Sequence, residues 1–305
     1  MQNLRLDGTE VCASWLTQRS HRAAYCDFLL PVTPENKEAA LADFAHEGEL
    51  GKFRGLRVSG ISDLSFLKKF PLLLYLEVLD QKKVNTRPLD GLTNLRGLRL
   101  ETPGAGLDFG CFPELEVFVG DWHADNSNLH RCQELRQIRA WKFKPGSKDL
   151  SCLAGVTRLE QLAVTQSDLT SFAGVEALED LRYLGVAYAP KLESLTALSK
   201  CGEGIRELDI TNARNVRNYK PIASIEKLRR LRLSYSAPMK NLKWTSGLNN
   251  LDFFSFVDTN VEDGDLSPLL KLPKLRYVGS MNKKHYSHNC DDLNEILNQR
   301  DERSA

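Results

Sequence analysis

Apolar residues recur along most of this chain in a short pattern, apolar-x-x-apolar-x-apolar. The pattern first begins at Phe53, returns every 20 to 24 residues and begins for the eleventh time at Leu275. Within each copy apolar and other residues alternate, which is the period of a β-strand with one buried face. The pattern therefore predicts about eleven short strands. Its copies are FRGLRV, LLYLEV, LRGLRL, LEVFVG, LRQIRA, LEQLAV, LRYLGV, IRELDI, LRRLRL, LDFFSF and LRYVGS.

Between the strand motifs lie segments that begin near an Asp, Ser or Thr and carry regularly spaced apolar residues. SDLSFLKKFP from Ser62 and GDLSPLLKLPK from Gly264 are two of them. This spacing favours one or two turns of 3₁₀ or α-helix after each strand. A strand and a turn that alternate at a fixed period predict a solenoid, in which each repeat packs only against its neighbours.

Taken together, the motifs and the segments between them resemble those of leucine-rich-repeat proteins, specifically the short-repeat internalin and SDS22-like subclass. The resemblance implies an α/β fold, a leucine-rich-repeat solenoid or horseshoe. Its concave parallel β-sheet would have about eleven strands, with short helices or 3₁₀ turns on the convex side. The family commonly has an Asn three residues after the last strand leucine. Here other residues hold that place, among them Ser167, Ser236 and Thr259, so we expect no asparagine ladder and an irregular curvature.

The two ends of the chain do not follow the repeat. We expect residues 1–52 to form an N-terminal cap, residues 53–284 the solenoid, and residues 285–305 a C-terminal tail or cap. Solenoid ends need such atypical units, because the first and last repeats would otherwise expose an apolar face to water.

Each cap has predicted elements of its own. In the N-terminal cap, residues 23–32 form a predicted strand, and residues 33–48 form a predicted helix with Thr33 as its N-cap. A short polar helix is predicted near the C-terminus. The face of the N-terminal helix that we expect to dock on the first repeat carries Ala40, Leu41, Phe44 and Ala45.

Charge and cysteine content narrow the choice of partner and compartment. The chain has 41 basic and 40 acidic residues and no basic stripe, which argues against a nucleic-acid partner. Its seven cysteines are scattered without C-x-x-C pairs, as expected of reduced thiols. We see neither a secretion signal nor an apolar run of membrane-spanning length. We therefore expect a soluble, cytoplasmic protein, and the sequence does not indicate its oligomeric state.

Catalytic and metal-binding patterns are weak. His285, His288 and Cys290 offer three possible zinc ligands without an obvious fourth, so we expect a solvated tail there. TPGAG at Thr102 lacks the Lys-Ser/Thr of a phosphate-binding loop. No acid/base pair or Ser/His/Asp arrangement stands out. We expect no enzyme activity, no catalytic residue, no metal and no cofactor.

The residues between the apolar positions should line the concave sheet, because side chains alternate along a strand. Trp, Tyr and Arg are frequent among them, and these residue types are enriched at binding hot spots. We expect a protein partner to bind there, above the small side chains of Ala163, Thr165, Gly185 and Ala187. The predicted partner-binding residues are Tyr75, Arg99, Asp121, Trp122, Arg139, Trp141, Tyr183, Tyr188, Asp209, Arg230, Arg232, Tyr235, Phe253 and Tyr277.

A plainer interpretation is that these residues only cover the sheet. Arg57, Glu77 and Arg99 would form a cross-strand charge ladder without any partner. The aromatic residues argue more strongly for an interface, since a tight cluster of exposed aromatic side chains is unfavourable in water.

Three functional hypotheses remain open. The first is a non-enzymatic protein-protein recognition module, such as a bacterial cytosolic inhibitor or immunity protein. The second is an SDS22-like regulatory or targeting subunit of an enzyme. The third is the leucine-rich-repeat part of an effector or ligase. The sequence does not name the partner.

Overall fold

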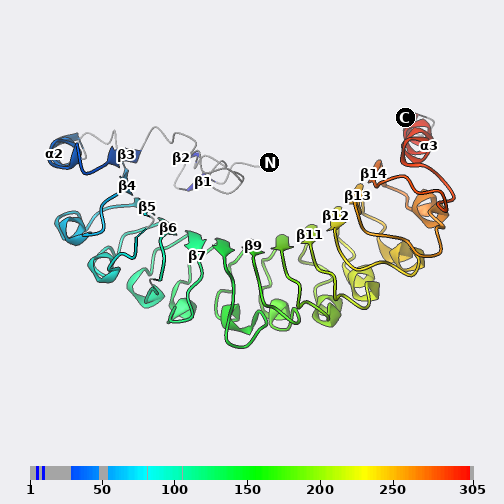
Figure 1. The fold of residues 1–305 in the computed structure, drawn as a ribbon, viewed down its shortest axis with the longest axis horizontal. Helices are drawn as coiled ribbons and strands as arrows, with labels where there is room; N and C mark the ends of the chain where they lie inside the picture. Colours follow the sequence, from blue (N-terminus) through cyan, green and yellow to red (C-terminus); the bar gives the residue numbers. More distant parts are fainter. Residues whose placement is uncertain are drawn as a thin grey trace. The chain divides into compact units, whose positions relative to one another are not determined.

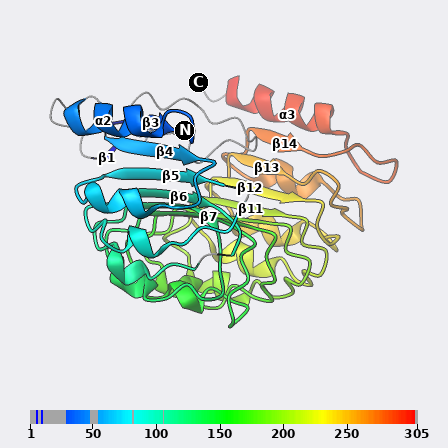
Figure 2. The ribbon, with the colours of Figure 1, turned by 60° about the vertical axis from the view of Figure 1, so that its left-hand side comes forward.

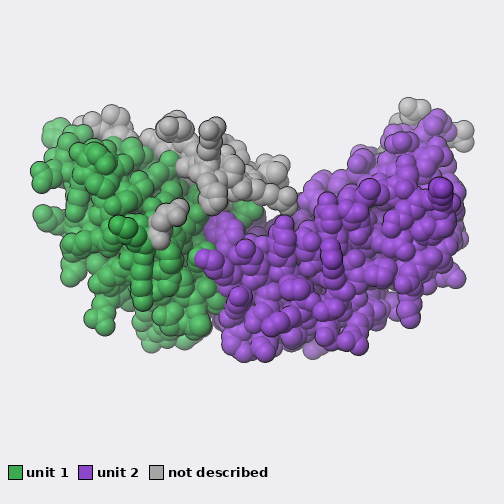
Figure 3. All heavy atoms as spheres, in the orientation of Figure 1, with its two compact units in different colours: residues 1–140 green, residues 141–305 purple. Residues whose placement is uncertain are grey.

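The computed structural model describes residues 5–6, 9–10, 29–47, 54–80, 82–104 and 106–302. The chain divides into two compact units, Met1–Ala140 and Trp141–Ala305 (Figure 3), and we describe each by itself. Twelve strands, β3 to β14, form a parallel sheet in which the strand order equals the chain order. The fold is therefore the leucine-rich-repeat solenoid that the sequence predicts.

In each unit, strands line one side of the repeats and 3₁₀ turns (η) line the other (Figures 1 and 2). Unit 1 contains β1 (Arg5–Leu6), β2 (Thr9–Glu10), β3 (Leu29–Val32), α2 (Lys37–Glu47), β4 (Gly55–Ser59), η1 (Ser65–Lys69), β5 (Tyr75–Leu79), η2 (Arg87–Leu89), β6 (Gly97–Glu101), η3 (Phe109–Cys111), β7 (Val117–Asp121), η4 (Leu129–Arg131) and most of β8 (Gln137–Trp141).

Unit 2 repeats the same alternation of strand and turn and ends in a helix. It contains η5 (Ser151–Leu153), β9 (Gln161–Thr165), η6 (Val175–Ala177), β10 (Tyr183–Ala187), η7 (Thr196–Lys200), β11 (Glu207–Thr211), η8 (Lys220–Ser224), β12 (Arg230–Ser234), η9 (Lys243–Gly247), β13 (Phe253–Ser255), η10 (Ser267–Lys271), β14 (Tyr277–Gly279) and α3 (Cys290–Glu302).

The core consists of the motif's apolar residues, as the alternation predicts. In β12, Leu231 and Leu233 are buried, whereas Arg230 and Arg232 lie on the opposite face. The turns add their own apolar residues to this core, for example Leu198 in η7 and Ile222 in η8. Burying large aliphatic side chains contributes roughly 1.5–3 kcal/mol each, so every repeat is held by apolar contacts with the next.

The N-terminal cap contributes a twelfth strand. β3 pairs in parallel with β4, Leu30 opposite Leu56, and this pairing was not predicted. The predicted strand extends back to residue 23, but residues 23–28 lie outside the described part. α2 packs on the first repeat through Phe44, whose ring meets that of Phe70 edge to face at 5.4 Å, as expected.

Two details of the predicted N-terminal helix were wrong. The helix begins at Lys37, because the backbone N–H of Thr33 donates to Asn36 Oδ1 at 2.7 Å and closes a turn before it. Thr33 is therefore not the N-cap. Ala45 is exposed and takes no part in docking, whereas Ala40 is buried with Phe44.

The C-terminal helix α3 covers the last strand. Leu293 and Leu297, on this helix, are buried in the core. The Asn294 carboxamide accepts from Val278 N–H at 2.8 Å and donates to Val278 C=O at 2.9 Å. A side chain thus satisfies backbone groups that another strand would otherwise pair with. Arg300 donates to the carbonyls of Leu272 and Leu275, so the C-terminal end of the helix is held as well.

Hydroxyl groups replace the missing asparagine ladder in part of unit 2. Ser236 Oγ accepts from the N–H of Ala213 at 3.2 Å, and Thr259 Oγ1 accepts from the N–H of Ser236 at 3.0 Å. Both hydroxyl side chains are buried. They satisfy backbone donors that burial would otherwise leave without a partner.

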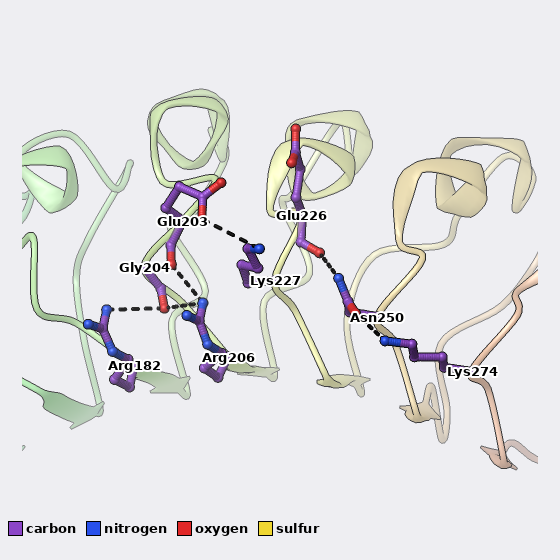
Figure 4. Close-up of polar contacts among 8 residues, drawn as sticks. All are labelled: Arg182, Glu203, Gly204, Arg206, Glu226, Lys227, Asn250 and Lys274. Atoms are coloured by element: carbon purple, nitrogen blue, oxygen red, sulfur yellow. Dashed lines mark hydrogen bonds and ion pairs between the residues drawn. The ribbon is translucent and has the colours of Figure 1, made fainter.

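Polar contacts also join successive repeats at the loops that precede β10 to β14 (Figure 4). Arg182 NH1, from the loop before β10, donates to the Gly204 carbonyl in the loop before β11 at 3.4 Å. Further along, Asn250 donates to the Glu226 carbonyl at 2.9 Å and accepts from Lys274 Nζ at 2.8 Å. These exposed contacts align the loops, and the buried leucines supply most of the stability.

The Thr259 hydroxyl gives a direct stability test. Thr259→Val keeps the side-chain shape but removes the acceptor for Ser236 N–H, so we expect a loss of about 1–2 kcal/mol in the free energy of unfolding. Urea unfolding followed by circular dichroism measures it. The matched control is Thr170→Val, since Thr170 is exposed and should change stability by less than about 0.5 kcal/mol. Equal effects of the two changes would contradict the role given to Thr259.

Cys132 provides a second test of the core. Burial raises the pKa of its thiol to about 12, and Sγ lies 3.2 Å from the Phe109 carbonyl. Because the thiolate is the reactive form, we expect Cys132 to resist iodoacetamide at pH 7 to 9 in the folded protein and to react after unfolding in urea. Peptide mass spectrometry reads out the modification. Rapid labelling of Cys132 in the folded protein would show that this part of the core opens readily.

Candidate functional site

The open face of unit 2 is the side of its sheet opposite the leucine core, and its side chains form rows across the strands. The strand register pairs Tyr183, Glu207, Arg230, Phe253 and Tyr277 in sequence from β10 to β14. A second row, two residues further along each strand, contains Ala163, Gly185, Asp209, Arg232, Ser255 and Gly279. These rows match those expected from the alternation of the motif.

An arginine–aromatic cluster, which we define as Arg230, Arg232, Phe253 and Tyr277, occupies β12 to β14. The rings of Phe253 and Tyr277 are stacked, with centroids 5.0 Å apart and planes inclined by 13°. The guanidinium carbons of Arg230 and Arg232 lie 4.5 and 5.3 Å from the Phe253 ring centroid. Such contacts contribute roughly 0.5–1 kcal/mol each at exposed sites and hold the side chains in defined positions.

Acidic residues of β11 face the two arginines. Arg230 Nε is 3.8 Å from Glu207 Oε2, and Arg232 NH1 is 3.5 Å from Asp209 Oδ2. Within the described part of the chain the guanidinium group of Arg230 makes no hydrogen bond, and that of Arg232 makes only this long one. The side chains are 41% and 44% exposed. Most of their N–H donors therefore remain available to a ligand.

Glu207 was not among the predicted binding residues. Its position directly opposite Arg230 in the register of two adjacent strands is a signal that the sequence already contained.

The predicted recess of small side chains is only partly present. Ala163 pairs with Gly185, and Thr165 with Ala187, as expected. The Tyr183 ring, however, folds along its own strand over Gly185, and its hydroxyl occupies the space that a Cβ on Gly185 would need. Tyr183 therefore fills the space above Gly185. Tyr277 leans over Gly279 in the same way, its Cε1 3.2 Å from such a Cβ.

Tyr188 and Tyr235 follow β10 and β12 and lie beyond the ends of those strands. Both have left-handed backbones, with φ of 52°, so the alternation along the strand does not extend to them. They therefore lie outside the rows that contain Tyr183 and Arg232, and their part in binding stays a prediction. Tyr188 is 59% exposed. The same left-handed backbone recurs at the equivalent position after other strands, at Lys142, Gln166, Asn212 and Asp258. The two exposed tyrosines therefore belong to a row of their own beyond the strand ends.

The remaining predicted binding residues belong to strands of unit 1 or to its boundary. Tyr75 begins β5 and is buried, whereas Arg99 and Arg139 occupy the centres of β6 and β8 and are half-buried. Asp121, Trp122 and Trp141 are half-buried residues at the ends of β7 and β8. They do not join the arginine–aromatic cluster.

The predicted charge ladder of unit 1 is confirmed. Arg57 is hydrogen-bonded to Glu77, and Arg99 NH1 lies 4.0 Å from the other carboxylate oxygen of Glu77. Arg99 in turn donates from Nε to Glu101 at 2.7 Å. The Glu77 side chain is 0% exposed. A buried carboxylate of this kind depends on the cations beside it, so this ladder has a structural role.

The described residues contain neither a cluster of side chains that could hold a metal ion nor a helix that could span a membrane. They contain no group of three or more His, Cys, Asp or Glu residues placed to hold a metal ion. Cys290 Sγ lies 2.9 Å from the Val278 carbonyl, and His285 Nε2 lies 3.0 Å from that of Val261. No helix in the described part of the chain is long and apolar enough to cross a bilayer.

The geometry defines a leucine-rich-repeat protein by its fold, and comparison with solved structures agrees. An internalin from Listeria monocytogenes superposes with a TM-score of 0.64 at 18% identity, over 79% of this chain and 71% of that one. The leucine-rich-repeat ectodomain of the Arabidopsis thaliana receptor kinase GASSHO1/SCHENGEN3 superposes with a TM-score of 0.52 at 13% identity, over 74% of this chain and 31% of that one. No protein-family model and no curated protein sequence matches the chain.

The charge ladder of unit 1 generates a test of its structural role. Arg57→Ala removes one cation from the buried Glu77, so we expect a loss of about 3 kcal/mol in the free energy of unfolding. Adding Glu77→Gln should recover part of that loss, because the uncompensated charge disappears. Urea unfolding of the two single variants and the double variant gives the coupling energy. Fully additive effects would show that the two side chains do not depend on each other.

Proposed function

We propose that this protein is a non-enzymatic module that binds another protein through the open face of unit 2. The leucine-rich-repeat fold is consistent with a protein–protein interaction module. The arginine–aromatic cluster is the single observation that supports the proposal most strongly. It presents exposed aromatic rings and guanidinium N–H groups, most of which make no hydrogen bond to any described residue, on a parallel sheet. Aromatic residues and arginine supply much of the binding energy at protein interfaces.

The structural relatives add support of a general kind. The Arabidopsis receptor ectodomain was solved in complex with CASPARIAN STRIP INTEGRITY FACTOR 2, so this fold can hold a bound factor. At 13% identity that similarity concerns the fold alone, and the site proposed for the present protein depends on its own residues.

We further propose that binding takes place in the cytoplasm and that it inhibits the partner, as an immunity protein does. The cysteines of the described residues are free, which fits a reducing compartment. A regulatory or targeting subunit, or part of an effector or ligase, would use the same face. An assay of the partner distinguishes them: an inhibitor abolishes the partner's activity at a 1:1 ratio, whereas a regulatory subunit redirects or preserves it.

The binding proposal is tested with a partner captured on the tagged full-length chain and then purified. We expect Phe253→Ala and Arg232→Glu each to weaken binding by more than about 2 kcal/mol, as central hot-spot residues do. Isothermal titration calorimetry measures Kd. The control is Arg217→Glu, which changes an equally charged but 78% exposed side chain in the loop between β11 and η8. If both cluster variants bind as tightly as the unmodified protein, the open face of unit 2 is not the binding site.

A further inference from the structure

The open face of unit 2 presents three kinds of side chain in a fixed order from β11 to β14. Glu207 and Asp209 place negative charge on β11, and Arg230 and Arg232 place positive charge on β12. Phe253 and Tyr277 then place aromatic surface on β13 and β14. Each kind occupies its own strand or strands, so a ligand that crosses the strands meets acid, base and aromatic surface in turn.

Strand spacing restricts the conformation of such a ligand. Neighbouring strands lie about 4.8 Å apart, so β11 to β14 span about 14 Å. The pitch of an α-helix is about 5.4 Å, and three of its turns advance about 16 Å. In an extended chain, side chains on one face are about 6.6 Å apart, and three such steps advance about 20 Å. A helix lying across the strands therefore matches one turn to each strand much better than an extended segment does.

The width of the face also suits a helix. On β11 and β12, each of five residues, the first and last open-face positions are about 13 Å apart, and a helix with its side chains is about 10–12 Å across. On β13 and β14, each of three residues, they are about 7 Å apart, so the helix extends past the ends of these two strands. At the far end of β11 and β12 the open-face residues, Thr211 and Ser234, are small. They leave room for a helix beside the larger side chains of the first row.

The existing ion pairs would not prevent such binding. Glu207–Arg230 and Asp209–Arg232 are separated by 3.8 and 3.5 Å, and exposed pairs of this kind contribute little to stability. Charges of a partner can therefore interact with these residues at small cost. Tyr277 is 48% exposed and stacks on Phe253, which fixes a ring against which an apolar side chain can pack.

From this order we propose that the partner binds through an amphipathic α-helix laid across β11 to β14. The inference rests on the proposed protein-binding function and specifies its ligand. The helix carries a basic residue facing Glu207, an acidic residue one turn away facing Arg230, and apolar residues on the next two turns facing Phe253 and Tyr277. Electrostatic complementarity of this kind determines partner choice and register.

Synthetic helical peptides test the proposal on the full-length chain. The matching peptide has Lys at position i, Glu at i+4 and Leu at i+7 and i+11 on an alanine-rich background, and a second version carries the same order reversed along the helix. In the control peptides Lys and Glu are exchanged, so composition and helicity stay the same. Fluorescence anisotropy measures Kd. We expect the better matching peptide to bind at least about 5-fold more tightly than its control, about 1 kcal/mol.

Exchanging charges on the protein gives the complementary measurement. The double variant Glu207→Arg/Arg230→Glu should lose or reverse the preference between the peptides. The control variant Glu193→Arg/Arg217→Glu exchanges another exposed ion pair, 3.4 Å apart and outside the strands, and should keep the preference. Circular dichroism and the thermal midpoint verify that both variants are folded.

The outcomes separate this inference from the proposed function. If matching and control peptides bind equally or not at all, or if the exchange on β11 and β12 leaves the preference unchanged, the helix proposal is wrong. Should Phe253→Ala still weaken binding of the captured partner, the open face would remain the binding site for a ligand of another shape. If that variant binds the captured partner normally, the proposed function fails as well.

Discussion

The rest of this structure depends on the parallel register of strands that the buried leucines of successive repeats impose. Because side chains alternate along a strand, burying one set commits the other set to the open face. Pairing Leu208 with Leu231, for example, necessarily places Asp209 beside Arg232. A shift of one residue would bury those charges and expose the leucines. The rows of the open face are thus a consequence of the core, and their composition can vary where the side chains are exposed.

The open-face rows of the two units differ in composition and in burial. In unit 1, the middle row buries a carboxylate between arginines, and Glu77 has no contact with solvent. In unit 2, the equivalent row carries Arg232 with a long, partly exposed ion pair. A buried charge that is compensated by its neighbours contributes to a defined structure, whereas an exposed guanidinium with unused donors can still bind a ligand. The same architecture therefore supports a structural network in one unit and a candidate interface in the other.

Much of the fold could be predicted from the sequence, because two periods encode it: the alternation within a strand and the 20-to-24-residue repeat. The rows of the open face followed directly. The direction in which a side chain leans could not be predicted from the alternation. Tyr183 lies over Gly185 because the glycine, two residues later in the same strand, leaves room for its ring. Nor could alternation place Tyr188 and Tyr235, whose backbones are left-handed. Strand β3 joined the sheet through pairing with β4, a contact that no repeat motif specifies.

The position of Asn294 links chemical modification of one side chain to self-association at the edge of the sheet. Its carboxamide imitates the next strand of the ladder by supplying one acceptor and one donor to Val278. A ladder that ends in this way offers no matching pair of groups to the edge of a second copy, which discourages fibre-like growth. Hydrolysis of that amide to a carboxylate would set a negative oxygen against the Val278 carbonyl. A chemical change at this one side chain would then leave the backbone groups of Val278 open to another strand, while Leu293, Leu297 and Arg300 still hold the helix.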